Sequence, residues 1–115
     1  MSRHAREIAW IKAARKAFGK FPVPAQRVMA RALTVAAEGG KADIAKPMKG
    51  LGSGVFEVAL PYRSDAYRVM YAVQVDEAVW VVHAFQKKST TGIKTARKDI
   101  ELVRDRIKRL KEDLR

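Results

Sequence analysis

The sequence predicts an α+β domain in which two N-terminal helices and a C-terminal helix pack on one face of a twisted antiparallel sheet of four to five strands. Hydrophobic residues recur with a helical period before Gly39, alternate with polar residues between Lys46 and Lys88, and are helical again from Ala96. Short turns separate the alternating segments, which favours antiparallel neighbours. The 115 residues suit one domain, 1–115, with the second face of its sheet partly open.

The N-terminal part predicts a short strand followed by two helices. Residues 7–11, EIAWI, are a candidate strand. A short helix is expected over residues 12–20, because Phe21 and Pro22 end it. Pro24 suits the first residue of a second helix, where its missing N–H costs nothing, and Gly39 and Gly40 stop that helix. Its apolar stripe consists of Ala25, Val28, Met29, Ala32, Leu33 and Ala36.

Four alternating segments predict the strands of the sheet. They span residues 46–51, 55–62, 67–75 and 79–88, and the turns between them are rich in Gly, Ser and Asp. One side of these strands is apolar and is expected to meet the helices. That side carries Phe56, Val58, Leu60, Tyr67, Val69, Tyr71, Val73, Val75, Val79, Val81, His83 and Phe85.

The C-terminal segment predicts an amphipathic helix. Its apolar residues are spaced by alternating steps of four and three, and its other faces are dense in Lys and Arg. A solvated face and an RNA-binding ridge both fit this pattern. The apolar residues are Ala96, Ile100, Val103, Ile107, Leu110 and Leu114.

The composition narrows the classes of partner and chemistry. Lys and Arg number 24 against 12 Asp and Glu, a formal charge of +12 that attracts polyphosphates. Cysteine is absent and the two histidines, His4 and His83, are too few for a histidine-built metal site, so no metal or cofactor is expected. The N-terminus lacks an apolar signal core and the run 78–85 is too short to span a bilayer, so we expect a cytoplasmic protein without a membrane partner.

A basic constellation is predicted on the second face of the sheet. If the apolar sides meet the helices, Glu57, Arg68, Gln86 and Lys88 point away from them, with small alanines between. Lys49 could reach the same rim. This arrangement suits a phosphodiester backbone. Lys46, Trp80, Gln86 and Lys87 are expected to contact RNA.

Without a metal, RNA can be cut by its own 2′-hydroxyl. The reaction needs a base, cations that stabilise the phosphorane, and an acid for the leaving oxygen. Arg68 is the natural phosphate clamp, because its guanidinium is planar and permanently charged. Lys87 or Lys88 could donate a proton or stabilise charge. Glu57 is the one carboxylate predicted on this face of the central strands, ionised but a weak base beside cations.

Each of these residues also has a purely structural interpretation. Glu57 and Arg68 could form a cross-strand ion pair, which contributes little if it is exposed. Lys87 and Lys88 could simply end a strand in solvent. His83 shares the parity of the apolar side, which favours a core histidine with satisfied nitrogens over a catalytic one. Trp80 could stack on a base or pack beneath a partner protein or a chain terminus.

Four motifs in the second half resemble one family. AKPMKGLGSGVFEVAL, DAYRVMYAV, VWVVHAFQKKSTTGI and a basic helix resemble the RelE/HigB-like toxins, and more narrowly their phage-associated HigB-like branch, which shows KPLKGL, GVxE, YRxxY and HAFxKK in this order. The opening AWIKAARKAFGKFP also resembles that branch. The resemblance covers nearly the whole chain.

The resemblance implies the RelE-like fold and a ribosome-dependent endoribonuclease that cleaves messenger RNA in the decoding site. It also implies a cognate helix-turn-helix antitoxin as partner. By motif, Lys49 matches a basic active-site residue, Arg68 the arginine that holds the scissile phosphate, and Lys88 a second catalytic arginine. The best-known relative has two lysines where this chain has Glu57 and Ala59, and its tyrosine after the last strand has no match beyond Lys88. Glu57 is therefore expected to be either the base or the orienter of Arg68.

Two other functions fit the same sequence. ParE-like toxins keep this fold, lack the ribonuclease residues and inhibit DNA gyrase. A plain nucleic-acid-binding module of phage origin would also be small and basic. The combination of Arg68 and Lys88 favours the ribonuclease.

Overall fold

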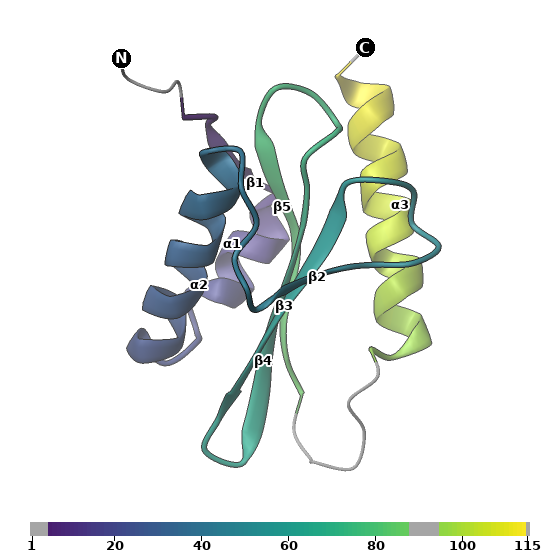
Figure 1. Cartoon of the computed structure of the whole chain (residues 1–115). Helices are drawn as coiled ribbons and strands as arrows, with labels where there is room; N and C mark the ends of the chain where they lie inside the picture. Colours follow the sequence, from purple (N-terminus) through teal and green to yellow (C-terminus); the bar gives the residue numbers. More distant parts are fainter. Residues whose placement is uncertain (1–4, 88–94, 115) are drawn as a thin grey trace.

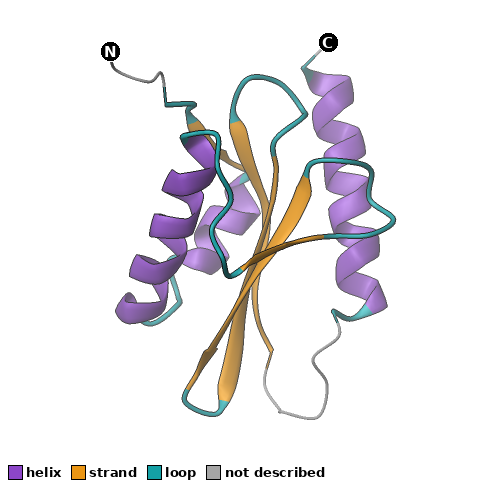
Figure 2. Cartoon of the chain, viewed as in Figure 1, coloured by secondary structure: helices purple, strands orange, loops and turns teal. Residues whose placement is uncertain are grey.

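The computed structural model describes residues 5–87 and 95–114, which form a five-stranded sheet between two layers of helix (Figure 1). Figure 2, coloured by secondary structure, shows the strands between the helices on either side. Within these ranges no helix is long and apolar enough to cross a membrane. In chain order the elements are β1 (Ile8–Trp10), α1 (Lys12–Phe18), α2 (Val23–Ala37), β2 (Ala45–Pro47), β3 (Val55–Tyr62), β4 (Asp65–Ala72), β5 (Val79–Lys87) and α3 (Arg97–Asp113).

The sheet is mixed, with strand order β1-β5-β4-β3-β2. β1 runs parallel to β5, with Ile8 opposite Val79, whereas the other neighbours are antiparallel. The predicted α+β class and number of strands are confirmed, but the expectation of a purely antiparallel sheet was wrong at this edge. The reason is that most of the chain lies between β1 and β5, so no tight turn dictates the direction of their pairing.

The first core lies between the sheet and helices α1 and α2. Helix α2 buries Met29 and Leu33 against Val58 and Val69 of the central strands. It begins at Val23, one residue before the predicted start at Pro24, and it ends before Gly39, whose φ of 94° is a left-handed conformation that glycine adopts without steric cost. This packing places both N-terminal helices on one face of the sheet.

Helix α3 covers the opposite face. It buries Val103 and Ile107 against Val55, Met70 and Val82, which form a second core. The prediction that all three helices share one face was therefore wrong. The physical reason is that the second side of β4 carries Met70 and Ala72, which also need a cover.

A β-bulge between β4 and β5 reverses the orientation of half of β5. Tyr71 lies opposite Val81 and Met70 lies opposite His83, which leaves Val82 as an extra residue. Such a one-residue shift moves every following side chain to the other face. His83 therefore faces α3, although its alternation with Val81 predicted the other face.

Arg6, just before β1, binds the backbone of the connection between β4 and β5. Its Nε donates a hydrogen bond to the carbonyl oxygen of Glu77 over 2.7 Å. Its Nη2 donates to the carbonyl oxygens of Val73, Asp76 and Ala78 over 2.6, 3.1 and 3.1 Å. One guanidinium thus satisfies four carbonyl groups that this connection leaves outside the sheet ladder.

Candidate active site

Arg68 lies in the middle of the sheet face that α3 covers. Its direct neighbours across the strands are Ala59 on β3 and Phe85 on β5. The small Ala59 side chain leaves room for the guanidinium, whose side chain is only 6% exposed. A charge with so little contact with water requires polar partners.

Glu57 and Thr95 provide those partners. Arg68 Nη1 donates to Glu57 Oε2 over 3.0 Å and to Thr95 Oγ1 over 3.1 Å. The Thr95 hydroxyl in turn donates to the same oxygen of Glu57 over 2.6 Å. The Glu57 side chain is 13% exposed, so this is a buried ion pair and not the exposed surface pair that the sequence left open. The three side chains form a closed triangle, in which the carboxylate orients the guanidinium.

The sequence did not predict the part played by Thr95. It precedes α3, a position where a hydroxyl often caps a helix. The N-cap residue of α3 is Ala96, without a side-chain capping bond, and the Thr95 hydroxyl bonds to Glu57 instead. Because Glu57 is 38 residues away in the chain, no local pattern indicates the contact.

His83 is buried beside this triangle, on the same face. Its Nε2 lies 2.9 Å from Asp99 Oδ1, and its ring stacks on Phe85 with the centroids 4.7 Å apart. Its Nδ1 lies 3.4 Å from Arg106 Nη1. Burial lowers the pKa of His83, which favours the neutral ring, and the nearby Arg106 adds to the effect while Asp99 opposes it. A neutral ring that donates to Asp99 and accepts from Arg106 has both nitrogens satisfied, as expected of a core histidine.

Two lysines flank Arg68 and Glu57 on their own face. Lys46 lies directly opposite Glu57 on β2 and is exposed. Directly opposite residues of antiparallel strands point to the same side, so Lys46 borders the ion pair. Lys87 is half-buried at the end of β5 and follows the orientation of Phe85, on the face of Arg68. Both lie on the face of the sheet that carries Arg68.

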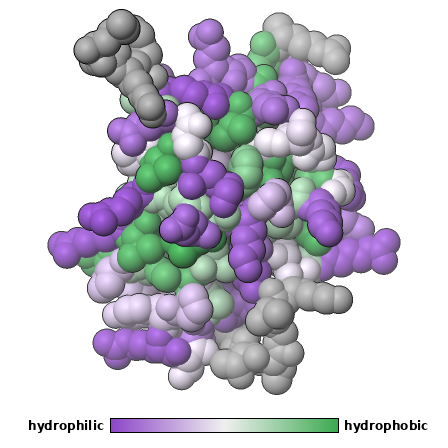
Figure 3. Space-filling view, viewed as in Figure 1, coloured by the Kyte–Doolittle hydropathy of each residue, from purple (hydrophilic) through white to green (hydrophobic). Residues whose placement is uncertain are grey.

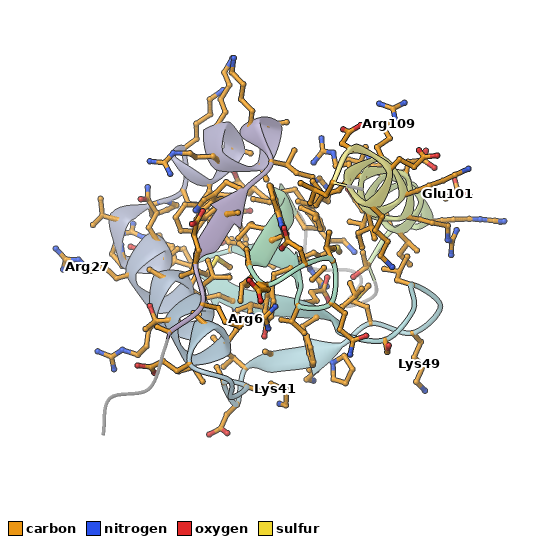
Figure 4. The ribbon with its side chains drawn as sticks, turned by 90° about the horizontal axis from the view of Figure 1, so that it is seen from above. Arg6, Arg27, Lys41, Lys49, Glu101 and Arg109 are labelled. Atoms are coloured by element: carbon orange, nitrogen blue, oxygen red, sulfur yellow. The ribbon has the colours of Figure 1, made fainter. Side chains whose placement is uncertain are left out.

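One predicted site lysine, Lys49, is not brought to this point. Lys49 is exposed in the connection between β2 and β3, and Figure 4 shows its side chain projecting away from the molecule. The adjacent Gly50 carbonyl accepts a hydrogen bond from Arg104 Nη2 of α3 over 3.1 Å. Lys88 lies outside the residues that the structure describes.

Trp80 and Gln86, predicted to contact RNA, also lie away from Arg68. Trp80 is opposite Ala72, at the far end of β4, and its Nε1 donates to Asp76 Oδ1 over 3.0 Å. Gln86 is opposite Tyr67, whose ring belongs to the core on the α1 and α2 face. The prediction that Gln86 shares the face of Arg68 was wrong, because the bulge at Val82 exchanges the two sides of β5.

The arrangement offers charge stabilisation. In residues 5–87 and 95–114, no three His, Asp or Glu side chains gather as a candidate metal site. A guanidinium held by a carboxylate, with lysines at its edge, suits a phosphate group. Arg68 is almost fully covered, and Thr95, which precedes α3, bonds to its guanidinium.

Comparison with known proteins agrees with this description. The family described as "Phage derived protein Gp49-like" matches residues 16–108. A free-state structure of an arginine-to-alanine double mutant of the Escherichia coli toxin RelE is similar with a TM-score of 0.61 and 19% identity, and covers 91% of this chain and 97% of that one. The crystal structure of the isolated E. coli RelE toxin has a TM-score of 0.55 and 19% identity, covering 88% and 98%. No curated protein matches. The predicted resemblance and RelE-like fold are confirmed.

Proposed function

This chain belongs to the Gp49-like family of phage-derived proteins, and from that premise we propose that it is the toxin of a type II toxin–antitoxin pair. Its activity is proposed to be the metal-independent cleavage of messenger RNA on the ribosome. The similarity of fold to the toxin RelE supports the first part of the proposal. The formal charge of +12 supports a nucleic-acid substrate.

The observation that carries the proposal is the buried pair of Arg68 and Glu57. Holding a guanidinium in a largely dehydrated site costs free energy, which a purely structural pair seldom recovers compared with apolar side chains. Such a group is pre-organised for a phosphate, because its orientation is already fixed when the substrate arrives. In the proposed reaction the 2′-oxygen bonds to the adjacent phosphorus while its proton passes to water, and Arg68 stabilises the phosphorane. The bond from phosphorus to the 5′-oxygen then breaks and that oxygen takes a proton from water, which leaves a 2′,3′-cyclic phosphate and a 5′-hydroxyl.

The remaining roles are proposed from the positions of the described side chains and, for Lys88, from the resemblance to RelE/HigB-like toxins. Glu57 accepts hydrogen bonds from both Arg68 and Thr95, so we assign it the orientation of Arg68 and not removal of the hydroxyl proton. Lys46 and Lys87 would bind the flanking phosphates, and Lys88 would stabilise the leaving oxygen. Lys49, being exposed, would contact RNA outside the reacting phosphate. The ribosome would supply much of the substrate alignment, which explains how so few groups suffice.

The proposed partners follow from this role. A cognate helix-turn-helix antitoxin would neutralise the protein, and its proposed contact site is the start of α3, where Thr95 bonds to Arg68. The ribosome and its message would be the partners of the free toxin in the cytoplasm. No cofactor is required by the proposed chemistry.

The test is primer extension on a reporter message translated in a purified system. We expect cuts within codons that require ribosomes and persist in the presence of a chelator. Arg68→Lys keeps the charge but loses the fork geometry, so cleavage should fall by roughly 100-fold, the scale of losing one oriented stabilising group. Arg109→Gln is the matched control, because Arg109 projects from α3 away from the site (Figure 4).

The cleavage assay and a gyrase supercoiling assay together distinguish the alternative functions. An intact message together with normal translation would contradict the ribonuclease. Inhibition of gyrase supercoiling would then identify a ParE-like toxin. Full cleavage by Arg68→Lys would instead show that the active site lies elsewhere.

A further inference from the structure

The positive charge of the protein is distributed unevenly between its helices. Residues 8–37, which contain β1, α1 and α2, include six Lys or Arg and no Asp or Glu. Helix α3 includes seven Lys or Arg but also five Asp or Glu. We call the six basic residues of the range 8–37 the α1–α2 basic surface. All six are exposed: Lys12, Arg15, Lys16, Lys20, Arg27 and Arg31.

Amphipathic packing turns these cations outward. Helix α2 buries Met29 and Leu33 against the sheet, whereas Arg27 and Arg31 are exposed and four residues apart, on one side of the helix. Figure 4 shows Arg27 pointing away from the molecule, and in Figure 3 long hydrophilic side chains project from the edge where Figure 1 places α2. In the part of the chain that the structure describes, no carboxylate pairs with any of the six.

The α1–α2 basic surface lies on the opposite side of the sheet from Arg68. The core beneath α1 and α2 contains Val69, whereas Arg68 points to the α3 side together with Met70. The two cationic regions are therefore separated by the thickness of the sheet. They cannot hold the same phosphate, so an anion bound at the α1–α2 basic surface would be distinct from one bound at Arg68.

We propose that the α1–α2 basic surface docks on the sugar–phosphate backbone of structured RNA. Naming that RNA as ribosomal rests on the proposed function. A surface shaped only by solubility mixes both signs of charge, as α3 does, whereas this surface holds one sign alone. Protein interfaces are anchored by buried aromatic residues, but the exposed large hydrophobic residues here are two valines, Val23 at 57% and Val28 at 41%.

The experiment measures binding to an RNA duplex that the protein cannot cut. A 2′-O-methylated duplex lacks the attacking hydroxyl, so fluorescence anisotropy reports docking alone. The test variant is Arg27→Gln with Arg31→Gln, and the matched control is Lys108→Gln with Lys111→Gln on α3. Each lowers the formal net charge from +12 by two, to +10. Circular dichroism checks that both variants are folded.

We expect the α2 variant to bind about 30-fold more weakly at 0.15 M salt, and its slope of log affinity against log salt to flatten by about 2, as for two lost phosphate contacts. The α3 control should change far less. Equal weakening of both variants would overturn the proposal, because net charge alone would then explain binding. Failure of the native protein to bind the duplex would overturn it too.

Two further outcomes separate this inference from its alternatives. If the α2 variant binds RNA normally but no longer binds the antitoxin, the surface is a protein interface and the proposal is wrong. If the α2 variant loses duplex binding while the native protein cuts no message, the docking surface stands and the proposed nuclease function fails. The duplex assay therefore judges the surface independently of catalysis.

Discussion

The imidazole of His83 and the carboxylate of Asp99 lie 2.9 Å apart and join the last strand of the sheet to the first turn of α3. On its other side the ring faces Arg106, also from α3, whose Nη1 also donates to the carbonyl oxygen of Val82 over 2.8 Å. Together with the bonds of Thr95, this contact holds the start of α3 over Arg68. Substitutions of His83 and Thr95 should therefore change the free energy of unfolding.

Acidification should lower the free energy of unfolding through protonation of His83. Burial lowers its pKa below the ordinary value of 6.5, so the unfolded chain binds the proton more readily than the folded one. The free energy of unfolding is thus greatest above pH 6.5 and falls as the pH drops through that value. Urea titrations at pH 7.5 and 5.5 measure this loss. In His83→Gln the difference between the two pH values should shrink, and an unchanged difference would assign the effect to other groups.

Replacing Thr95 with valine should weaken the cover over Arg68. Valine keeps the shape but removes the hydroxyl that bonds Glu57 and Arg68, so we expect a loss of about 1–2 kcal/mol in unfolding free energy. Thr95→Ser retains the hydroxyl and serves as the control. Chemical denaturation measures both. Equal stability of the valine and serine variants would mean that the hydrogen bonds add nothing.

Removing the carboxylate of Glu57 should be costlier, because it leaves the guanidinium of Arg68 buried without its counter-charge. We expect Glu57→Ala to lose about 3 kcal/mol of stability. A double-mutant cycle with Arg68→Met isolates the interaction, since the second change removes the charge that Glu57 compensates. The two losses should not add. Strict additivity would show that the pair is not coupled.

Arg6→Met should release the connection between β4 and β5. Four carbonyl groups lose their donor, and backbone amides near Asp76 should exchange hydrogen faster. Arg63→Met, a change in the exposed turn between β3 and β4, is the control. Hydrogen exchange followed by mass spectrometry compares the two variants. Unchanged exchange near Asp76 in Arg6→Met would show that the sheet itself fixes this connection.

The elements of the fold were largely predictable from hydrophobic period and turn residues. The predicted bounds of β3 match the structure, and Pro24 and Gly39 mark the ends of α2 closely. The wrong predictions concern which face of the sheet α3 and the side chains of β5 occupy, and the direction in which β1 pairs with β5. Alternation assumes an unbroken strand, and the extra residue Val82 breaks it, so His83 was assigned to the wrong side. Nothing local indicates the bulge, because it depends on the register with β4.

The candidate site was predictable in part. Glu57 belongs to β3 and Arg68 to β4, and both precede the bulge. The alternation of these two strands is intact, so the shared face of the two side chains was predicted. Their burial was not, because it depends on where α3 packs. Thr95 and Asp99 come from the other end of the chain and reach the sheet only through that packing. Long-range contacts of this kind have no signature in sequence spacing.

The parallel pairing of β1 with β5 has a consequence for synthesis. The first strand of the chain has its only sheet neighbour in the last one, within the described residues, so the sheet stays incomplete until Val79 and its neighbours have emerged. Helix α3 emerges later still. Such non-local pairing slows folding, since the intervening chain must first be closed into a loop. While its ribosome is still making it, a nascent chain therefore lacks the finished sheet and the helix that hold Arg68 in place.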